Sequence, residues 1–132
     1  MSSIIEVVAL ALQRKKDNKY MIARRGPEES GAGFWEFPGG KLELGESQPE
    51  ALVREISEEF SFQLEMKSLR YVDQSTYEYG GRKIRIYLWA CALDVIPDFV
   101  LIDHDETTWC DPSEMRTYKI SPGDVYFIDK LV

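Results

Sequence analysis

The sequence contains few residues suited to nucleophilic or soft-metal chemistry: two cysteines and one histidine among 132 residues. Cys91 and Cys110 lack the spacing of metal ligands, and we expect them to be buried free thiols in a reducing cytoplasm. His104 is the only histidine of the sequence. The sequence therefore gives little indication of a Ser-His-Asp triad or of a histidine-based metal centre. We expect His104 to lie in a loop.

Long apolar and basic segments are also missing. No run of about 18 apolar residues is present, so we expect no membrane span. Residues 1–6 lack the basic stretch of a secretory signal, which favours a cytoplasmic protein. The net charge of −7 argues against a general nucleic-acid binder, so no stable nucleic-acid complex is expected. A chain of 132 residues is long enough for one domain with a real core and too short for two.

Turn residues divide the chain into β-rich and helical segments. Gly80-Gly81 lies between two β-rich runs and predicts a hairpin. Ser47 and Glu50 form a capping box around Pro49, which predicts the start of a helix. The expected strands are Ile4–Leu12, Tyr20–Arg25, Leu69–Tyr79 and Lys83–Leu93. The expected helices are Ser47–Phe60, 111–114 and 121–131. This order predicts an α/β fold in which a mixed sheet lies between helices.

One short segment concentrates acidic residues. Glu55, Glu58 and Glu59 stand at i, i+3 and i+4, so their carboxylates share one helix face. Each like-charged pair costs an isolated helix roughly 0.2–0.5 kcal/mol, and one arginine is not enough to compensate them. Hard divalent cations bind such clusters, usually together with a phosphate. The pattern therefore predicts an Mg²⁺ site, with Mn²⁺ as the alternative ion; a solvated acidic face is the other interpretation.

These acids belong to a longer pattern, G-x5-E-x7-R-E-[apolar]-x-E-E. It is formed by Gly40, Glu46, Arg54, Glu55, Ile56, Glu58 and Glu59. The pattern resembles the signature of the Nudix hydrolases, and many fixed positions over a short span make it specific. The resemblance implies an α/β/α sandwich with a mixed sheet, formed by residues 1–132 as a single Nudix hydrolase domain.

The signature normally ends with a glycine, but this chain has Ser61 at that position. A glycine just after a helix usually takes the left-handed conformation. Ser61 would cost roughly 1 kcal/mol in that conformation, unless the chain leaves the helix by another route. The departure affects the loop geometry and not the expected chemistry.

Hydrolysis of a phosphoanhydride requires neutralised phosphate charge and a deprotonated water. We expect Glu55 and Glu59 to be the first metal ligands, while Glu58 adds a ligand or polarises the water. Glu46 reaches the same site if its loop folds back. Arg54 orders the acidic side chains through charge-assisted hydrogen bonds; its alternative role is an ordinary surface ion pair.

The residues before the helix extend the resemblance. Gly39 and Gly40 allow the backbone to approach a ligand closely; the resemblance implies that the Gly39 carbonyl binds metal, and Lys41 is a candidate cation for phosphate or water. Arg24-Arg25, followed after ten residues by Glu36–Lys41, is similar to the MutT-type nucleoside triphosphate pyrophosphohydrolases. This subgroup implies that Arg24 contacts a substrate phosphate; a solvated arginine is the alternative.

A late acidic ligand is also implied by the subgroup, six residues before a tryptophan. Counting back from Trp109 leads to Asp103, where aspartate replaces the usual glutamate. Because its side chain is one methylene shorter, direct ligation could become water-mediated. Asp105 and Glu106 are rival candidates, and an acidic loop that stays in solvent is the alternative.

Base recognition is expected from Asp124. Several segments are similar to cytidine-type members of the subgroup, and Asp124 follows Trp109 by fifteen residues, where those members carry aspartate. A carboxylate accepts from the amino group of cytosine, which favours a cytosine nucleotide; service in the first turn of the last helix is the compatible alternative. The aromatic candidates for base stacking are Phe34, Trp35, Tyr79 and Tyr87. The expected substrate contacts are Arg24, Glu36, Phe37, Tyr79 and Asp124.

The resemblance implies an Mg²⁺-dependent enzyme that hydrolyses a nucleoside triphosphate, with a normal, methylated or oxidised base, to the monophosphate and pyrophosphate. Alternative activities are hydrolysis of NDP-sugars or dinucleotides and removal of pyrophosphate from RNA 5′ ends. An inactive Nudix-like nucleotide-binding module is the non-enzymatic alternative. We expect a monomer or homodimer with a small-molecule substrate.

Overall fold

The structure is a computed structural model that describes residues 4–131. Its central strand is β1 (Ile4–Arg14), whose eleven residues all pair in parallel with β6 (Arg82–Leu93). The strand β5 (Arg70–Tyr79) pairs antiparallel with β6 and forms one edge of the sheet. The apolar run of β1 thus lies in the interior of the sheet, because both of its faces are covered.

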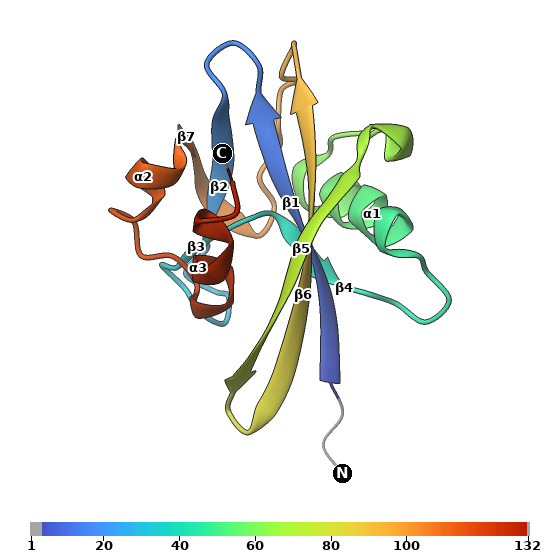
Figure 1. The fold of residues 1–132 in the computed structure, drawn as a ribbon, viewed down its shortest axis with the longest axis vertical. Helices are drawn as coiled ribbons and strands as arrows, with labels where there is room; N and C mark the ends of the chain where they lie inside the picture. The colour runs from blue at the N-terminus through green and yellow to red at the C-terminus, as the bar shows by residue number, and fades with distance from the viewer. Residues whose placement is uncertain (1–3, 132) are drawn as a thin grey trace.

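The sheet is split between β1 and its sequence neighbour. The remaining strands are β2 (Lys19–Arg25), β3 (Trp35–Glu36), β4 (Gly39–Lys41) and β7 (His104–Cys110). β1 and β2 pair at Gln13–Tyr20 and Arg14–Lys19, next to their turn, and then diverge. Farther along, β2 pairs with β3 and β7, whereas β1 pairs with β4 (Figure 1). Residues 35–41 therefore connect the two halves of the sheet.

Gly39 allows this connection to lie directly against β1. A Cβ atom on Gly39 would stand 1.9 Å from the carbonyl oxygen of Val8, so no larger residue fits. The amide of Leu10 donates to the carbonyl of Pro38 at 2.7 Å. The segment Pro38-Gly39 therefore contacts the most buried part of β1.

Helices cover both faces of the sheet (Figure 1). The long helix α1 (Gln48–Phe60) covers one face, and the short helices α2 (Pro112–Met115) and α3 (Pro122–Ile128) cover the other; η1 (Met66–Ser68) is one 3₁₀ turn. Val8, Leu10 and Leu12 of β1 pack in the cluster with α1, whereas Ala9 and Ala11 pack in the cluster with α3. The predicted mixed sheet between helices is confirmed. Within residues 4–131, the helices are too short or too polar for a membrane span.

The expectation that His104 lies in a loop is wrong. His104 begins β7 and is only 6% exposed. The sequence does not predict β7, because this strand pairs with β2 alone and carries the polar run His104–Thr108. Cys91 and Cys110 are buried free thiols, as expected.

Ser61 takes the left-handed conformation that the missing glycine would take. Its φ is 54° and its ψ is 38°, and its amide donates to the carbonyl of Ser57 at 3.0 Å. The helix therefore ends as the glycine-containing signature implies, with a serine that lacks the conformational freedom of glycine.

We expect Ser61→Gly to raise the free energy of unfolding by about 0.5–1 kcal/mol, because glycine relieves the left-handed strain. Urea unfolding followed by circular dichroism measures the change. Ser61→Ala is the control, since alanine keeps the strain and should give no gain. Equal stabilisation by both variants would show that the serine side chain, and not its backbone conformation, is responsible.

Candidate active site

Arg54 organises the acidic residues at the start of the site. Its Nε and Nη2 atoms donate to the two carboxylate oxygens of Glu46 at 2.7 and 3.0 Å. Its Nη1 atom donates to Glu55 at 2.9 Å and to Glu58 at 3.1 Å, and Nη2 also donates to the Lys41 carbonyl at 3.0 Å. The hydrogen bonds from Arg54 lower the pKa of Glu46. The loop before α1 therefore folds back, which was the condition for Glu46 to join the other acids, and Arg54 contacts three of the expected acids.

Glu59 lies outside this arginine network. Its Oε2 atom is buried and has no hydrogen-bond partner. Burial, together with the nearby charges of Glu55, Glu36 and Asp103, raises the pKa of Glu59 to about 8, although Arg25 opposes the shift. Burial also raises the pKa of Glu55, although Arg54 opposes this shift. Acidic side chains thus converge on Glu59, which itself forms no ion pair within residues 4–131, whereas Glu55 and Glu36 are paired with arginines.

The segment before β7 brings Asp103 to this cluster. The amides of Val100 and Ile102 donate to the carbonyls of Phe60 and Glu59 at 3.0 and 3.3 Å, so the loop is bound to the C-terminal end of α1. Asp103 follows directly and is close enough to affect the pKa of Glu59.

The rival acids are engaged elsewhere. Arg24 donates to Asp105 at 2.8 Å and forms an ion pair with Glu106 at 3.3 Å. Of the three candidates for the late acid, Asp103 is the one that approaches Glu59. The same contacts mean that Arg24 is already paired with two carboxylates, so its phosphate contact remains a prediction.

The backbone of β4 lies against the acids of α1. A Cβ atom on Gly40 would stand 2.2 Å from a carboxylate oxygen of Glu55, so a larger residue here would displace this carboxylate. The carboxylates of Glu55 and Glu59, with an unpaired buried oxygen on Glu59, provide the hard oxygen donors that Mg²⁺ prefers. Among residues 4–131, no three His, Cys, Asp or Glu side chains are already arranged as a ligand set. In this arrangement one carboxylate oxygen of Glu55 accepts from Arg54.

A second group of polar residues lies across the split in the sheet. Both carboxylate oxygens of Glu36 accept from Nη1 of Arg25, at 3.1 and 3.2 Å, and Oε2 also contacts Nε2 of His104 at 2.9 Å. Asp124 is 5% exposed and accepts from the amide of Phe37 at 3.0 Å. Burial raises the pKa of Asp124 to about 8, with a further contribution from Glu36. Glu36 therefore stands between the acids of α1 and Asp124.

Two cavities lie near these acidic residues. A cavity of about 470 Å³ lies between the start of β1 and residues 41–46. Another of about 320 Å³ lies between β5 and α3, lined in part by Tyr77 and Gly123. Both volumes are in the range of small-ligand pockets.

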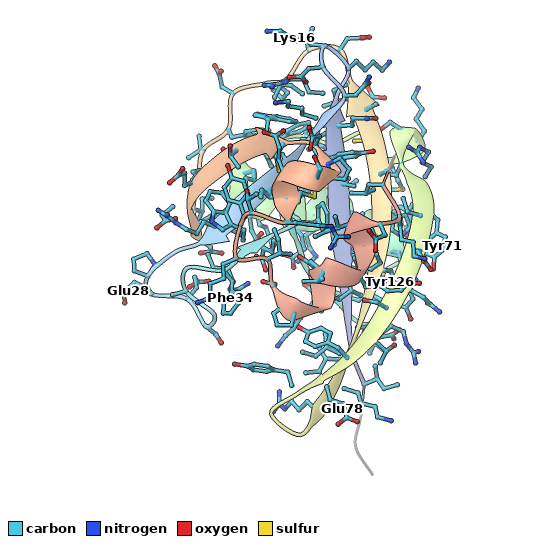
Figure 2. The ribbon with its side chains drawn as sticks, turned by 60° about the vertical axis from the view of Figure 1, so that its left-hand side comes forward. Lys16, Glu28, Phe34, Tyr71, Glu78 and Tyr126 are labelled. Atoms are coloured by element: carbon cyan, nitrogen blue, oxygen red, sulfur yellow. The ribbon has the colours of Figure 1, made fainter. Side chains whose placement is uncertain are left out.

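Some expected contacts are not brought to the site. Tyr79 is 63% exposed near the tip of the β5–β6 hairpin. Figure 2 shows its neighbour Glu78 at the free end of that hairpin. Tyr87 contacts Glu6 instead, through its hydroxyl. Lys41 is exposed beside the Arg54 network, to which it contributes its carbonyl.

Sequence reasoning missed Arg25, His104 and Tyr77, which the structure places around Glu36 and Asp124. Strand alternation indicates that Arg24 and Arg25 point to opposite faces, but not which face holds the site. Nothing in the local sequence around His104 signals its burial.

Known proteins resemble this chain in sequence. A family model for the NUDIX domain matches residues 8–130. The chain is 37% identical over 130 residues to CTP pyrophosphohydrolase of Escherichia coli (strain K12), an alignment that covers 96% of this chain and 90% of that protein. It is 35% identical over 82 residues to 8-oxo-dGTP diphosphatase of the same organism, which covers 62% of each chain.

Solved structures agree in fold. The solution structure of the E. coli ORF135 protein has a TM-score of 0.81 and 35% identity, covering 98% of this chain and 89% of that chain. The crystal structure of the MutT protein from Methanosarcina mazei Go1 has a TM-score of 0.82 at 23% identity, covering 98% and 91%, and is a likeness of fold alone. The chain therefore belongs to the Nudix family and is a hydrolase of the MutT type.

Proposed function

We propose that this Nudix hydrolase converts a nucleoside triphosphate to the monophosphate and pyrophosphate with Mg²⁺ bound. The observation that carries the proposal is Glu59, a buried acid with an unpaired oxygen among the charges of Glu55, Glu36 and Asp103. A buried carboxylate without a partner is costly, and a divalent cation removes that cost. The relatives named CTP pyrophosphohydrolase and 8-oxo-dGTP diphosphatase support a nucleoside triphosphate as substrate.

In this proposal Glu55 and Glu59 hold the ion, with the Gly39 carbonyl, Glu58 and Asp103 as further ligands. When bound, Mg²⁺ neutralises phosphate charge and lowers the pKa of a coordinated water. We assign to Glu58, an exposed acid of α1, the role of accepting the proton of the attacking water.

The basic and neutral groups around these ligands have positioning roles. Arg54 keeps Glu46, Glu55 and Glu58 in one orientation, since its guanidinium contacts all three. Lys41 and Arg24 contact the phosphates.

We propose a cytosine nucleotide as the preferred substrate, read by Asp124. Burial keeps this acid neutral at pH 7, so it offers one donor and one acceptor, in contrast to the ionised carboxylate that the sequence suggests. The Phe37 amide donates to Oδ2, which favours the proton on Oδ1 and fixes the order of donor and acceptor. Cytosine presents an N4 amino donor beside the N3 acceptor, which matches that order. The 37% identical CTP pyrophosphohydrolase supports this choice.

We expect Glu59→Gln to lower kcat by at least about 100-fold, because a lost metal ligand removes several kcal/mol of transition-state stabilisation. Pyrophosphate release from CTP measures the loss. Thermal unfolding with and without Mg²⁺ gives a second readout: the ion should raise the Tm of the wild type and not that of the variant.

Glu43→Gln is the matched control, since Glu43 is exposed and contacts Arg54 only at 3.5 Å. It should keep both activity and the Mg²⁺-dependent rise in Tm. Normal turnover by Glu59→Gln would remove Glu59 from the site and would overturn the proposal.

We expect the wild type to lose kcat/KM for CTP as the pH rises through about 8, because Asp124 ionises and loses its donor. Asp124→Asn keeps one donor and one acceptor at every pH. At pH 9 its kcat/KM for CTP should therefore exceed that of the wild type by about three- to tenfold. The charged and polar groups that face Asp124 are Glu36, Arg25 and Tyr77.

The same titration has a consequence for stability. The unfolded chain loses the Asp124 proton near pH 3.8 and the folded chain near 8, so between these values the folded state binds more protons and wild-type stability falls as the pH rises. Thermal unfolding of Asp124→Asn should lack the part of this pH-dependent fall in stability that Asp124 causes. An identical pH dependence of CTP hydrolysis in both proteins would confine Asp124 to a structural role in α3.

A further inference from the structure

Tyr77 is a polar side chain of β5 that the mechanism above leaves unused. It is half-buried and pairs with Ile84 across the hairpin. Its ring packs against α3, since a Cβ atom on Gly123 would stand 2.2 Å from a ring carbon of Tyr77. Within residues 4–131, the tyrosine hydroxyls that form hydrogen bonds are those of Tyr87 and Tyr126. The Tyr77 hydroxyl is therefore available to a ligand.

The surroundings of this hydroxyl place it at the base end of the site. Burial raises the pKa of Tyr77, and the charges of Asp124 and Glu36 raise it further, whereas Arg25 lowers it. The Asp124 carboxyl is held by the amide of Phe37, the residue after Glu36. Oxygen-bearing side chains from β5, α3 and β3 thus converge on one region.

The neighbours of Tyr77 leave one atom of a cytosine edge without a hydrogen-bond partner. Glu36 only accepts, and it is already engaged by Arg25 and His104. Asp124 supplies one donor and one acceptor, which meet N3 and the N4 amino group of cytosine. The O2 atom of cytosine still requires a donor. Arg25 and His104 are already engaged with Glu36, whereas the uncharged Tyr77 hydroxyl has no hydrogen-bond partner within residues 4–131.

We infer that the Tyr77 hydroxyl is a specificity-determining group of the base subsite and donates a hydrogen bond to O2 of a cytosine base. The inference rests on the proposed function and deepens it, because it assigns a partner to the third polar atom of the base edge. Tyr77, and not the exposed Tyr79 near the hairpin tip, is then the tyrosine of this strand that contacts the base.

Tyr77→Phe tests the inference, since it removes the hydroxyl and keeps the ring that packs on Gly123. We expect KM for CTP to rise about three- to tenfold, the effect of one neutral hydrogen bond, with kcat and Tm little changed. Turnover of methyl triphosphate, which has no base, should be the same in both proteins. With 2-thio-CTP, whose sulfur is a weaker acceptor than O2, the difference between wild type and variant should shrink.

Tyr71→Phe is the matched control, because Tyr71 lies on the same strand, is exposed and packs on Trp89. It should leave all these constants unchanged. Wild-type kinetics for Tyr77→Phe on CTP, in an enzyme that hydrolyses CTP, would overturn the inference alone. If the wild type releases pyrophosphate from no nucleotide, the proposed function fails, and calorimetry with CMP still decides: equal affinities in wild type and Tyr77→Phe would overturn the inference.

Discussion

The divergence of β1 from β2 is the constraint on which the site depends. The two strands share hydrogen bonds only beside their turn, in the part of the chain that the structure describes, and residues 35–41 lie between them afterwards. Gly39 and Gly40 make this possible, since one contacts the backbone of Val8 and the other the carboxylate of Glu55. A single short segment thereby reaches the acids of α1 at one end and Asp124 at the other, through Phe37.

Electrostatics divides the acidic residues into two groups. The positive charge of Arg54 compensates the negative charges of Glu46, Glu55 and Glu58. These contacts hold the loop before α1 against the helix. Glu59 has no such cation, and burial among like charges raises its pKa. Arg54 thus orders one group of acids, and Glu59 has a buried oxygen without a partner where a divalent cation is proposed to bind.

Local signals were sufficient for the parts of the fold that depend on neighbouring residues. The capping box of Ser47 and Glu50, the hairpin at Gly80-Gly81 and the left-handed option at Ser61 are all present. The position of Arg54 beside Glu55 led to the expectation that it orders the acids through hydrogen bonds, and it contacts Glu46, Glu55 and Glu58. The strand β7 escaped prediction because it is an edge strand with polar residues, so no apolar alternation marks it.

The Nudix pattern, the helix that carries it and the mixed sheet could all be derived from the order of residues, because capping, periodicity and spacing act over a few positions. Only the folded chain shows that Asp103 approaches Glu59, that His104 is buried against Glu36 and that burial raises the pKa of Asp124. Each of these depends on contacts between residues tens of positions apart. Burial and the field of distant charges set a pKa, and neither has a signature in the residues next to the group that titrates.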